Sequence, residues 1–130
     1  MHLGQLWKLD DTTLINKAGI WRSPNKWNFI HNGDGTIYIE NTSDGNKVLG
    51  LNGSLLNGDE VVPEVKVSNK AGQLWIKGEE MAGGYTTLKN YESSKVLTAT
   101  ASGLKAKGNY ININYIPVHL CIYFTLIQFL

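Results

Sequence analysis

The tryptophans of this chain recur in a repeated frame, and this repetition limits the possible folds more than any other feature. Three of the four follow a short segment that starts with a side-chain amide: Gln5-Leu-Trp7, Asn25-Lys-Trp27 and Gln73-Leu-Trp75. Each is followed by an asparagine in a related segment, at separations of 9, 14 and 15 residues. Such self-similarity predicts one supersecondary unit built several times. The fourth tryptophan, Trp21, has no place in this frame.

The segments that contain these asparagines also align with one another. Residues 37–50 match residues 86–98 and share an Asn, a Ser and the tripeptide Lys-Val-Leu, with one residue fewer in the second copy. Thr12-Thr-Leu-Ile-Asn16 is a weaker third copy. A unit of roughly 40 to 50 residues with short strands cannot bury its own apolar face, so the units should share one core. The three repeated tryptophans are expected to lie in that core.

The local sequence patterns predict short strands and no long helix. Gly, Asn, Thr and Ser interrupt every stretch that might otherwise form an amphipathic helix. Strand-forming segments lie between turn signals, and we expect strands at 36–41, 47–51, 61–67, 73–77, 85–89, 95–99 and 104–107. The chain is therefore expected to be all-β, with hairpins assembled into a sandwich or barrel.

Length, charge and cysteine content exclude several classes of protein. The chain has 130 residues, which is the size of one domain. Its formal net charge is +1, so the chain lacks the excess of basic residues that is typical of a nucleic-acid-binding protein. The single cysteine, Cys121, excludes an intramolecular disulfide and a zinc site built from several thiolates. We expect no metal and no cofactor.

With these repeats, the chain resembles the ricin-type β-trefoil lectins. Repeats in that family end in Gln-x-Trp and carry a Gly-Lys-Cys-Leu-Asp-like segment earlier in the unit. The resemblance covers roughly Gly4 to Asn109 and includes Gln5/Trp7, Gln73/Trp75 and the shortened variant Asn25/Trp27. It implies a β-trefoil with three unequal repeats around one core, in which the Trp is buried and the Gln supports the fold. It also implies a non-catalytic carbohydrate-binding module.

The chain departs from this family pattern at positions that matter for sugar binding. Gly50 and Thr98 stand where the resemblance implies the ligand-binding Asp, and Val48 and Val96 stand where many relatives have a disulfide-forming Cys. Loss of the Asp favours an alternative, a β-trefoil that has lost sugar binding and contacts protein instead. The valines are expected to replace the disulfides by apolar packing.

The candidate ligand-binding residues cluster in the second unit. They are Asp44, Asn46, Asn57, Asp59, Asn69 and Gln73. Several could converge on one pocket, because sugar hydroxyls need paired donors and acceptors. The alternative is that 44–46 and 57–59 are hairpin turns selected for backbone preference. A cavity lined by Asp44, Asn69 and an aromatic ring would favour the lectin.

The sequence offers no catalytic constellation. The three histidines (His2, His31 and His119) are scattered, and the adjacent pair Glu79-Glu80 is more simply part of a loop than a glycosidase dyad. We therefore expect no enzyme. Because no secretory signal is recognisable, we expect a cytoplasmic protein, with secretion as part of a longer precursor as the alternative.

Both ends of the repeat region are unusual. No Gln-x-Trp motif closes the unit that begins at Tyr85, and Gln5-Leu-Trp7 could supply its last strand. The unit from Thr12 to Trp27 is too short for four strands, so at least one lobe should be incomplete. We place the domain at 4–109 and assign no role to the apolar tail at 110–130, which has no Asp, Glu, Lys or Arg. Membrane anchoring is disfavoured, since the segment from Ile116 to Leu130 has only 15 residues, fewer than the roughly 18 to 20 that span a bilayer, and is interrupted by Pro117, His119 and Gln128. A second hypothesis is that the tail is foreign to the domain and leaves aggregation-prone surface exposed.

Overall fold

The computed structural model describes residues 3–19, 25–52 and 59–108, and this part of the chain is built from short β-strands. The strands are β1 (Trp7–Asp10), β2 (Thr13–Asn16), β3 (Trp27–His31), β4 (Ile37–Asn41), β5 (Lys47–Asn52), β6 (Asp59–Val65), β7 (Trp75–Lys77), β8 (Leu88–Asn90), β9 (Val96–Thr100) and β10 (Gly103–Lys107). Three single 3-10 turns accompany them: η1 (Leu3–Gln5), η2 (Ala71–Gln73) and η3 (Ala82–Gly84). The all-β expectation is confirmed for the described residues.

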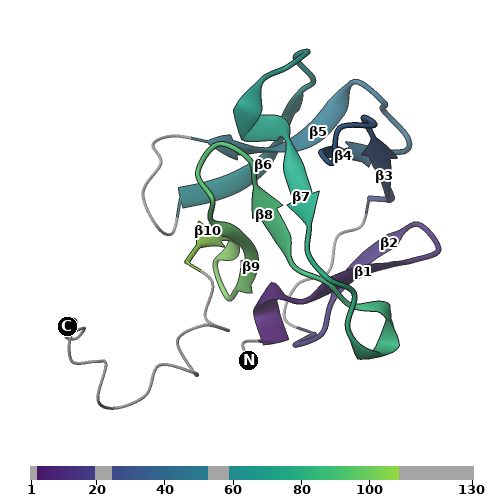
Figure 1. Ribbon diagram of the computed structural model, residues 1–130, viewed down its shortest axis with the longest axis vertical. Helices are drawn as coiled ribbons and strands as arrows, with labels where there is room; N and C mark the ends of the chain where they lie inside the picture. Colours follow the sequence, from purple (N-terminus) through teal and green to yellow (C-terminus); the bar gives the residue numbers. More distant parts are fainter. Residues whose placement is uncertain (1–2, 20–24, 53–58, 109–130) are drawn as a thin grey trace.

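The strands form a closed antiparallel ring with one hairpin beside it (Figure 1). The main sheet has the order β3-β4-β5-β6-β10-β9-β8-β7, and β7 also pairs with β4. This second pairing, with Ile37 opposite Trp75, closes a ring of the strands β4 to β10, and β3 pairs with β4 outside that ring. The remaining hairpin consists of β1 and β2. Closure leaves few unpaired sheet edges.

The repeated Trp and Asn residues are partners across the strands. Trp7 lies opposite Asn16, Trp27 opposite Asn41 and Trp75 opposite Asn90. The neighbouring backbone hydrogen bonds repeat as well: Lys17 N–H to Leu6 C=O at 2.9 Å, Thr42 N–H to Lys26 C=O at 2.9 Å, and Tyr91 N–H to Leu74 C=O at 2.8 Å. The three hairpins therefore have the same Trp–Asn register, and the unequal separations in the sequence reflect their different loop lengths.

The N-terminal strand completes the third lobe, as expected from the missing motif after Tyr85. Trp7 and Thr86 exchange two backbone hydrogen bonds of 2.8 Å. Thr86 corresponds in the repeat to Ile37, which faces Trp75, and to Thr12, whose carbonyl accepts the Trp27 N–H at 2.8 Å. A strand from the start of the described chain therefore pairs with the lobe at its end. Figure 1 shows the N-terminal turn η1 beside β9.

In the described residues, one lobe shows no counterpart to the hairpin that the other two possess. The second lobe contains β5 and β6, and the third contains β9 and β10. Only residues 17–26 separate β2 from β3, and those that the structure describes, 17–19 and 25–26, are not in strands. β5 and β6 alone use 6 and 7 residues, so this connection is too short for an equivalent pair. The length of this connection supports the expectation of an incomplete lobe.

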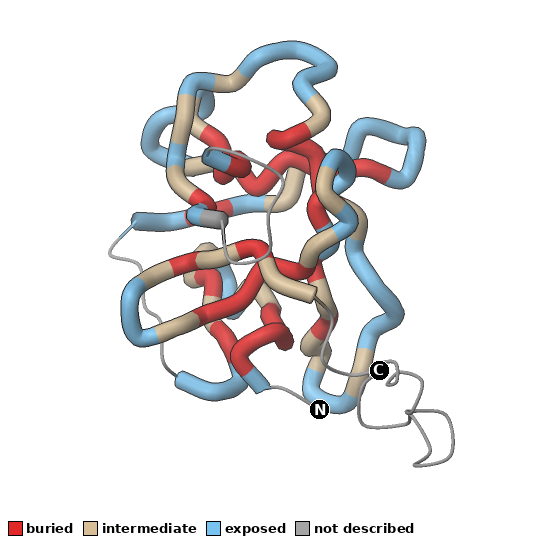
Figure 2. Tube along the Cα trace, turned by 90° about the vertical axis from the view of Figure 1, so that its left-hand side faces the viewer, coloured by how far each residue is buried: buried red, intermediate tan, exposed pale blue. Residues whose placement is uncertain are grey.

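The core is centred on the three repeated tryptophans, which are all buried. Figure 2 shows that buried positions gather in the middle of the molecule and that exposed positions lie mostly in the loops around it. Trp75 Nε1–H donates to the Leu49 carbonyl at 3.0 Å, and Trp7 Nε1–H donates to the Leu97 carbonyl at 2.9 Å. Each acceptor is the leucine of a Lys-Val-Leu tripeptide. The tripeptide recurs because one residue supplies both an apolar side chain to the core and a carbonyl to the indole. Val48 and Val96 are buried as well, which confirms that apolar packing occupies the family's cysteine positions.

Several predicted strand boundaries were wrong. The expected strands 73–77 and 85–89 are observed as β7 (Trp75–Lys77) and β8 (Leu88–Asn90). The expected strand 61–67 is observed as β6, from Asp59 to Val65. It ends early because the Val67 N–H donates to the Gln73 side chain at 2.8 Å rather than to a strand. Trp21, Asn57 and the 110–130 tail lie outside the described residues.

Candidate functional site

Gln73, which we expected among the ligand-binding residues, lies inside the protein with its whole amide in use. Its exposed fraction is 0%. Its Nε2 donates to the Val65 carbonyl at 2.7 Å and to Glu64 Oε1 at 2.8 Å, while its Oε1 accepts the Val67 N–H. This side chain ties the end of β6 to η2. A buried amide with satisfied partners stabilises the fold and is not presented to a ligand.

The other predicted residues do not all meet. Asp44 and Asn46 are exposed and form a tight turn, in which Asp44 Oδ1 accepts the Asn46 N–H at 3.1 Å. This is the backbone role that the turn interpretation predicted. Asn57 is outside the described residues, and Asp59 begins β6. Among the predicted residues whose side chains the structure describes, Asn69 alone lines a cavity.

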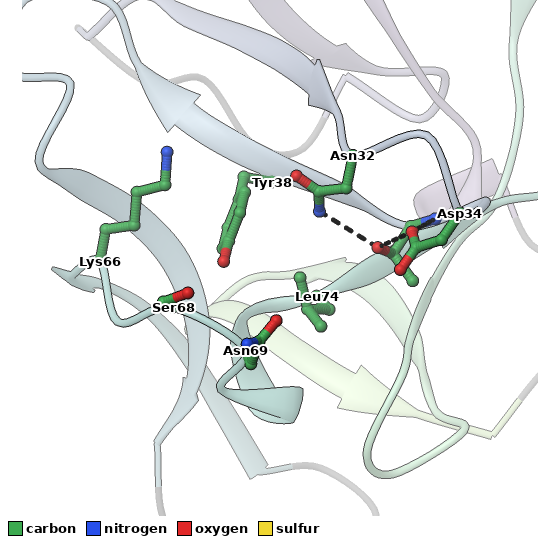
Figure 3. Close-up of a pocket in the computed structure, with 8 residues that line it drawn as sticks. Asn32, Asp34, Tyr38, Lys66, Ser68, Asn69 and Leu74 are labelled. Carbon is green, nitrogen blue, oxygen red and sulfur yellow. Dashed lines mark hydrogen bonds between the residues drawn. The ribbon is translucent and has the colours of Figure 1, made fainter.

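That cavity, which we call the Tyr38 cavity, has a volume of about 470 Å³. It lies between the β3–β4 turn, β4 and the segment that follows β6. Its lining residues are Asn32, Asp34, Thr36, Tyr38, Lys66, Ser68, Asn69 and Leu74 (Figure 3). Amide, carboxylate, hydroxyl and aromatic groups therefore surround one space.

Asn69 reaches the cavity because its backbone is left-handed. Its φ is +62°, and it lies in a turn closed by the Lys70 N–H to Val67 carbonyl hydrogen bond at 3.2 Å. Asparagine tolerates this conformation better than most residues. Its exposed side chain extends toward the cavity (Figure 3).

Asp34 supplies the carboxylate of the site. Its Oδ1 accepts hydrogen bonds from the Thr36 hydroxyl at 2.6 Å and the Thr36 N–H at 2.9 Å. Asn32 Nδ2 donates to the same hydroxyl at 3.1 Å. The Thr36 side-chain bond, with help from the backbone bond, lowers the pKa of Asp34, so this carboxylate stays ionised to a lower pH than an ordinary Asp. Its second oxygen has no hydrogen-bond partner among the described residues.

Tyr38 forms the aromatic wall. Its neighbours Ile37 and Ile39 point into the central core, so strand alternation turns Tyr38 to the opposite face. There it packs with Val48 and Leu74, and its hydroxyl points into the cavity (Figure 3). Lys66 Nζ lies 4.5 Å from the ring centroid and covers one face.

Sequence reasoning missed Asp34 and Tyr38 for different reasons. Asp34 lies in Asn32-Gly-Asp-Gly35, a sequence that is typical of a hairpin turn and does not by itself indicate a binding site. The alternation in Ile37-Tyr-Ile39 was the signal for Tyr38, because a strand that buries both isoleucines must direct the tyrosine elsewhere. Neither pattern indicates that the β3–β4 turn and the residues after β6 meet.

Gly50 of β5 stands where the family has an Asp, and a side chain from the next strand, β6, fills the space of that Asp. A Cβ added to Gly50 would overlap the Glu64 carboxylate, so the Glu64 side chain occupies this space. Glu64 Oε1 accepts from Gln73 Nε2 at 2.8 Å and from Lys70 Nζ at 3.2 Å. In the third lobe Thr98 is buried, and its hydroxyl donates to the Val96 carbonyl and accepts from Gln5. Both equivalent positions are engaged within the fold.

The closed ring with three related lobes defines the class of protein as a β-trefoil. A designed three-fold symmetric protein, ThreeFoil, shares the fold: its crystal structure matches with a TM-score of 0.56 and 19% identity over 79% of this chain and 81% of that one. The family model described as ricin-type β-trefoil lectin domain-like matches residues 25–115, more than half of the chain. The chain belongs to this family. No curated protein matches it.

Membership of this family indicates a function at the level of the family. Ricin-type lectin domains bind carbohydrate and are generally non-catalytic. Within the described residues, no group of three or more His, Cys, Asp and Glu side chains could hold a metal ion. The same part of the chain contains no helix that is long and apolar enough to cross a membrane.

Proposed function

We propose that this domain is a non-catalytic carbohydrate-binding module whose ligand lies in the Tyr38 cavity. The observation that carries the proposal is the meeting of ionised Asp34 with the amides of Asn32 and Asn69 and the ring of Tyr38 around one space. A sugar presents neighbouring hydroxyls that need both acceptors and donors. The domain itself is proposed as residues 4–109, with 110–130 as a separate tail.

The size and chemistry of the cavity support this function. Its volume of about 470 Å³ falls within the range of small-ligand sites. Because Lys66 covers one face of Tyr38, we expect hydrogen bonds to contribute more than stacking. Asp34 would supply the carboxylate that binds the sugar, in place of the Asp that the family has where this chain has Gly50.

The Asp34→Asn variant is expected to bind sugar about tenfold more weakly, because a hydrogen bond to a charged group contributes roughly 1.5 to 3 kcal/mol. The sugar is first identified on a glycan array with heat-denatured protein as background, and its affinity is then measured by calorimetry. Asp44→Asn is the matched control, since Asp44 also accepts a backbone N–H in an exposed turn but does not line the cavity.

A second variant removes the amide of the site without straining the backbone. Asn69→Gly keeps the left-handed φ accessible, whereas alanine there would be strained. Equal affinities for wild type, Asp34→Asn and Asn69→Gly, with Asp44→Asn unchanged, would reject the Tyr38 cavity as the sugar site.

The pH dependence of binding follows from the lowered pKa of Asp34. The folded protein favours the ionised carboxylate, so the Thr36 hydrogen bonds are fully formed above the usual Asp pKa and are lost only as the pH falls through the lowered value. Sugar affinity should therefore stay constant from neutral pH down to the usual Asp range and decrease below it. A decrease that begins well above that range would contradict the role of Asp34.

The alternative function is a protein-interaction module, and the filled position at Gly50 favours it. Val65 and Val67 add exposed apolar surface at the end of β6, with exposed fractions of 51% and 48%. A folded sample that retains no glycan would support this alternative.

A further inference from the structure

A second cavity, which we call the axial cavity, lies outside the proposed sugar site and has a volume of about 360 Å³. Its lining residues are Lys8, Leu9, Phe29, Lys77, Glu80, Gly83, Gly84 and Thr86. It shares no residue with the Tyr38 cavity.

Three of these residues hold the same place in the repeat. Leu9, Phe29 and Lys77 each follow a repeated tryptophan by two residues, on β1, β3 and β7. Alternate residues of a strand share a face, so these side chains lie on the same strand face as the tryptophans. Leu9 and Phe29 are partly buried there, and Lys77 at the end of β7 is exposed. Leu9 and Phe29 indeed pack against the core. All three residues line the axial cavity.

The long β7–β8 connection forms one wall of the axial cavity. It contains η3, where Gly83 and Gly84 have φ values of +80° and +84°. The Lys8 Nζ donates to the Gly83 carbonyl at 3.1 Å and so holds this connection against β1 (Figure 1). The β1–β2 connection is only two residues long and contributes no such wall.

The cavity combines an apolar floor with excess positive charge. Lys77 Nζ lies 5.7 Å from the Phe29 ring centroid, and Lys8 Nζ lies 4.9 Å from that of Tyr85. Lys17 Nζ lies 5.3 Å from the same Tyr85 ring. In the described part of the chain, the ion pairs use Lys66, Lys70 and Lys105 and none of these three lysines. Glu80 is the one carboxylate that lines the cavity.

We propose that the axial cavity binds a small organic carboxylate with a flat apolar body. The apolar body would contact Leu9 and Phe29, which are only partly buried. The carboxylate would meet the ammonium groups of Lys77 and Lys8, where no ion pair has to be broken first. Of the three equivalent repeat positions, Leu9 and Phe29 thus supply the apolar surface, and Lys77 supplies a positive charge. This site is independent of sugar binding.

The test is calorimetric titration of the whole chain with benzoate, with benzyl alcohol as the neutral analogue and inorganic phosphate as the anion without an apolar body. Lys77→Gln should weaken benzoate binding about fivefold, the effect of one nearby charge. Lys89→Gln, which removes an exposed lysine on β8 outside the cavity, should leave the affinity unchanged. Glu80→Gln should strengthen binding, because it removes the opposing carboxylate.

Several results would overturn the proposal. These are benzyl alcohol or phosphate binding as tightly as benzoate, no benzoate binding at all, or equal effects of Lys77→Gln and Lys89→Gln. A Glu80→Gln variant that binds benzoate more weakly than wild type would also contradict it. Cooperative thermal unfolding of each variant establishes that the fold is intact before the comparison is made.

Discussion

The Trp75→Ala variant is expected to lose cooperative folding at 25 °C. Trp75 is fully buried, and its indole donates to the Leu49 carbonyl. Truncating a buried Trp costs about 3 to 5 kcal/mol, against a total stability of about 5 to 15 kcal/mol. This domain should lie at the low end of that range, because the missing hairpin removes packing from one lobe.

Trp75 also has a topological role that increases the expected effect. Its strand pairs with β8 on one side and with β4 on the other, which closes the ring. The measurement is urea unfolding followed by circular dichroism and by the fluorescence of the remaining tryptophans. Tyr91→Ala, at a 54% exposed side chain, is the control and should change stability by no more than about 0.5 kcal/mol. A Trp75→Ala protein with wild-type cooperativity and midpoint would show that the tryptophan is not part of the core.

The Gly50→Asp variant, which restores the family's carboxylate, is expected to destabilise the domain by about 2 kcal/mol rather than to create a sugar site. The new Cβ overlaps the Glu64 carboxylate, so Glu64 must rotate away and release the buried Gln73 amide. An unsatisfied buried polar group costs about 1 to 3 kcal/mol. The two carboxylates would also repel each other. Urea midpoints of wild type and variant measure the loss.

A double-mutant cycle separates this overlap from other causes. Glu64→Ala alone removes an acceptor of Gln73 Nε2 and should also destabilise. In the double variant Gly50→Asp with Glu64→Ala, the new carboxylate has room beside Gln73 and no like charge. We therefore expect the double variant to be more stable than the sum of the single effects predicts. Strict additivity would mean that residues 50 and 64 do not share this space.

The repeat pattern predicted the fold well because repeats encode pairing as well as composition. The Trp and Asn positions proved to be cross-strand partners in all three hairpins. The closure by Trp7 followed from the same reasoning, since a lobe without its last motif needs a strand from elsewhere. The Gln of the motif was harder to interpret. Gln73 is polar and lies near other polar residues in the sequence, yet its burial depends on the path of residues 64–67.

The sequence by itself determined the class of fold, the identity of the core tryptophans and the incompleteness of the first lobe. These properties follow from residue type and from the spacing of the repeated motifs, both of which can be read directly from the sequence. Only the tertiary structure decided which polar groups meet. Asp34 and Asn69 are 35 residues apart in the sequence and line one cavity together with Tyr38 of β4. Glu64 fills the place of the absent Asp across the β5–β6 strand pair. Such contacts depend on how loops of unequal length are arranged around a closed ring, and no local pattern in the chain records that arrangement.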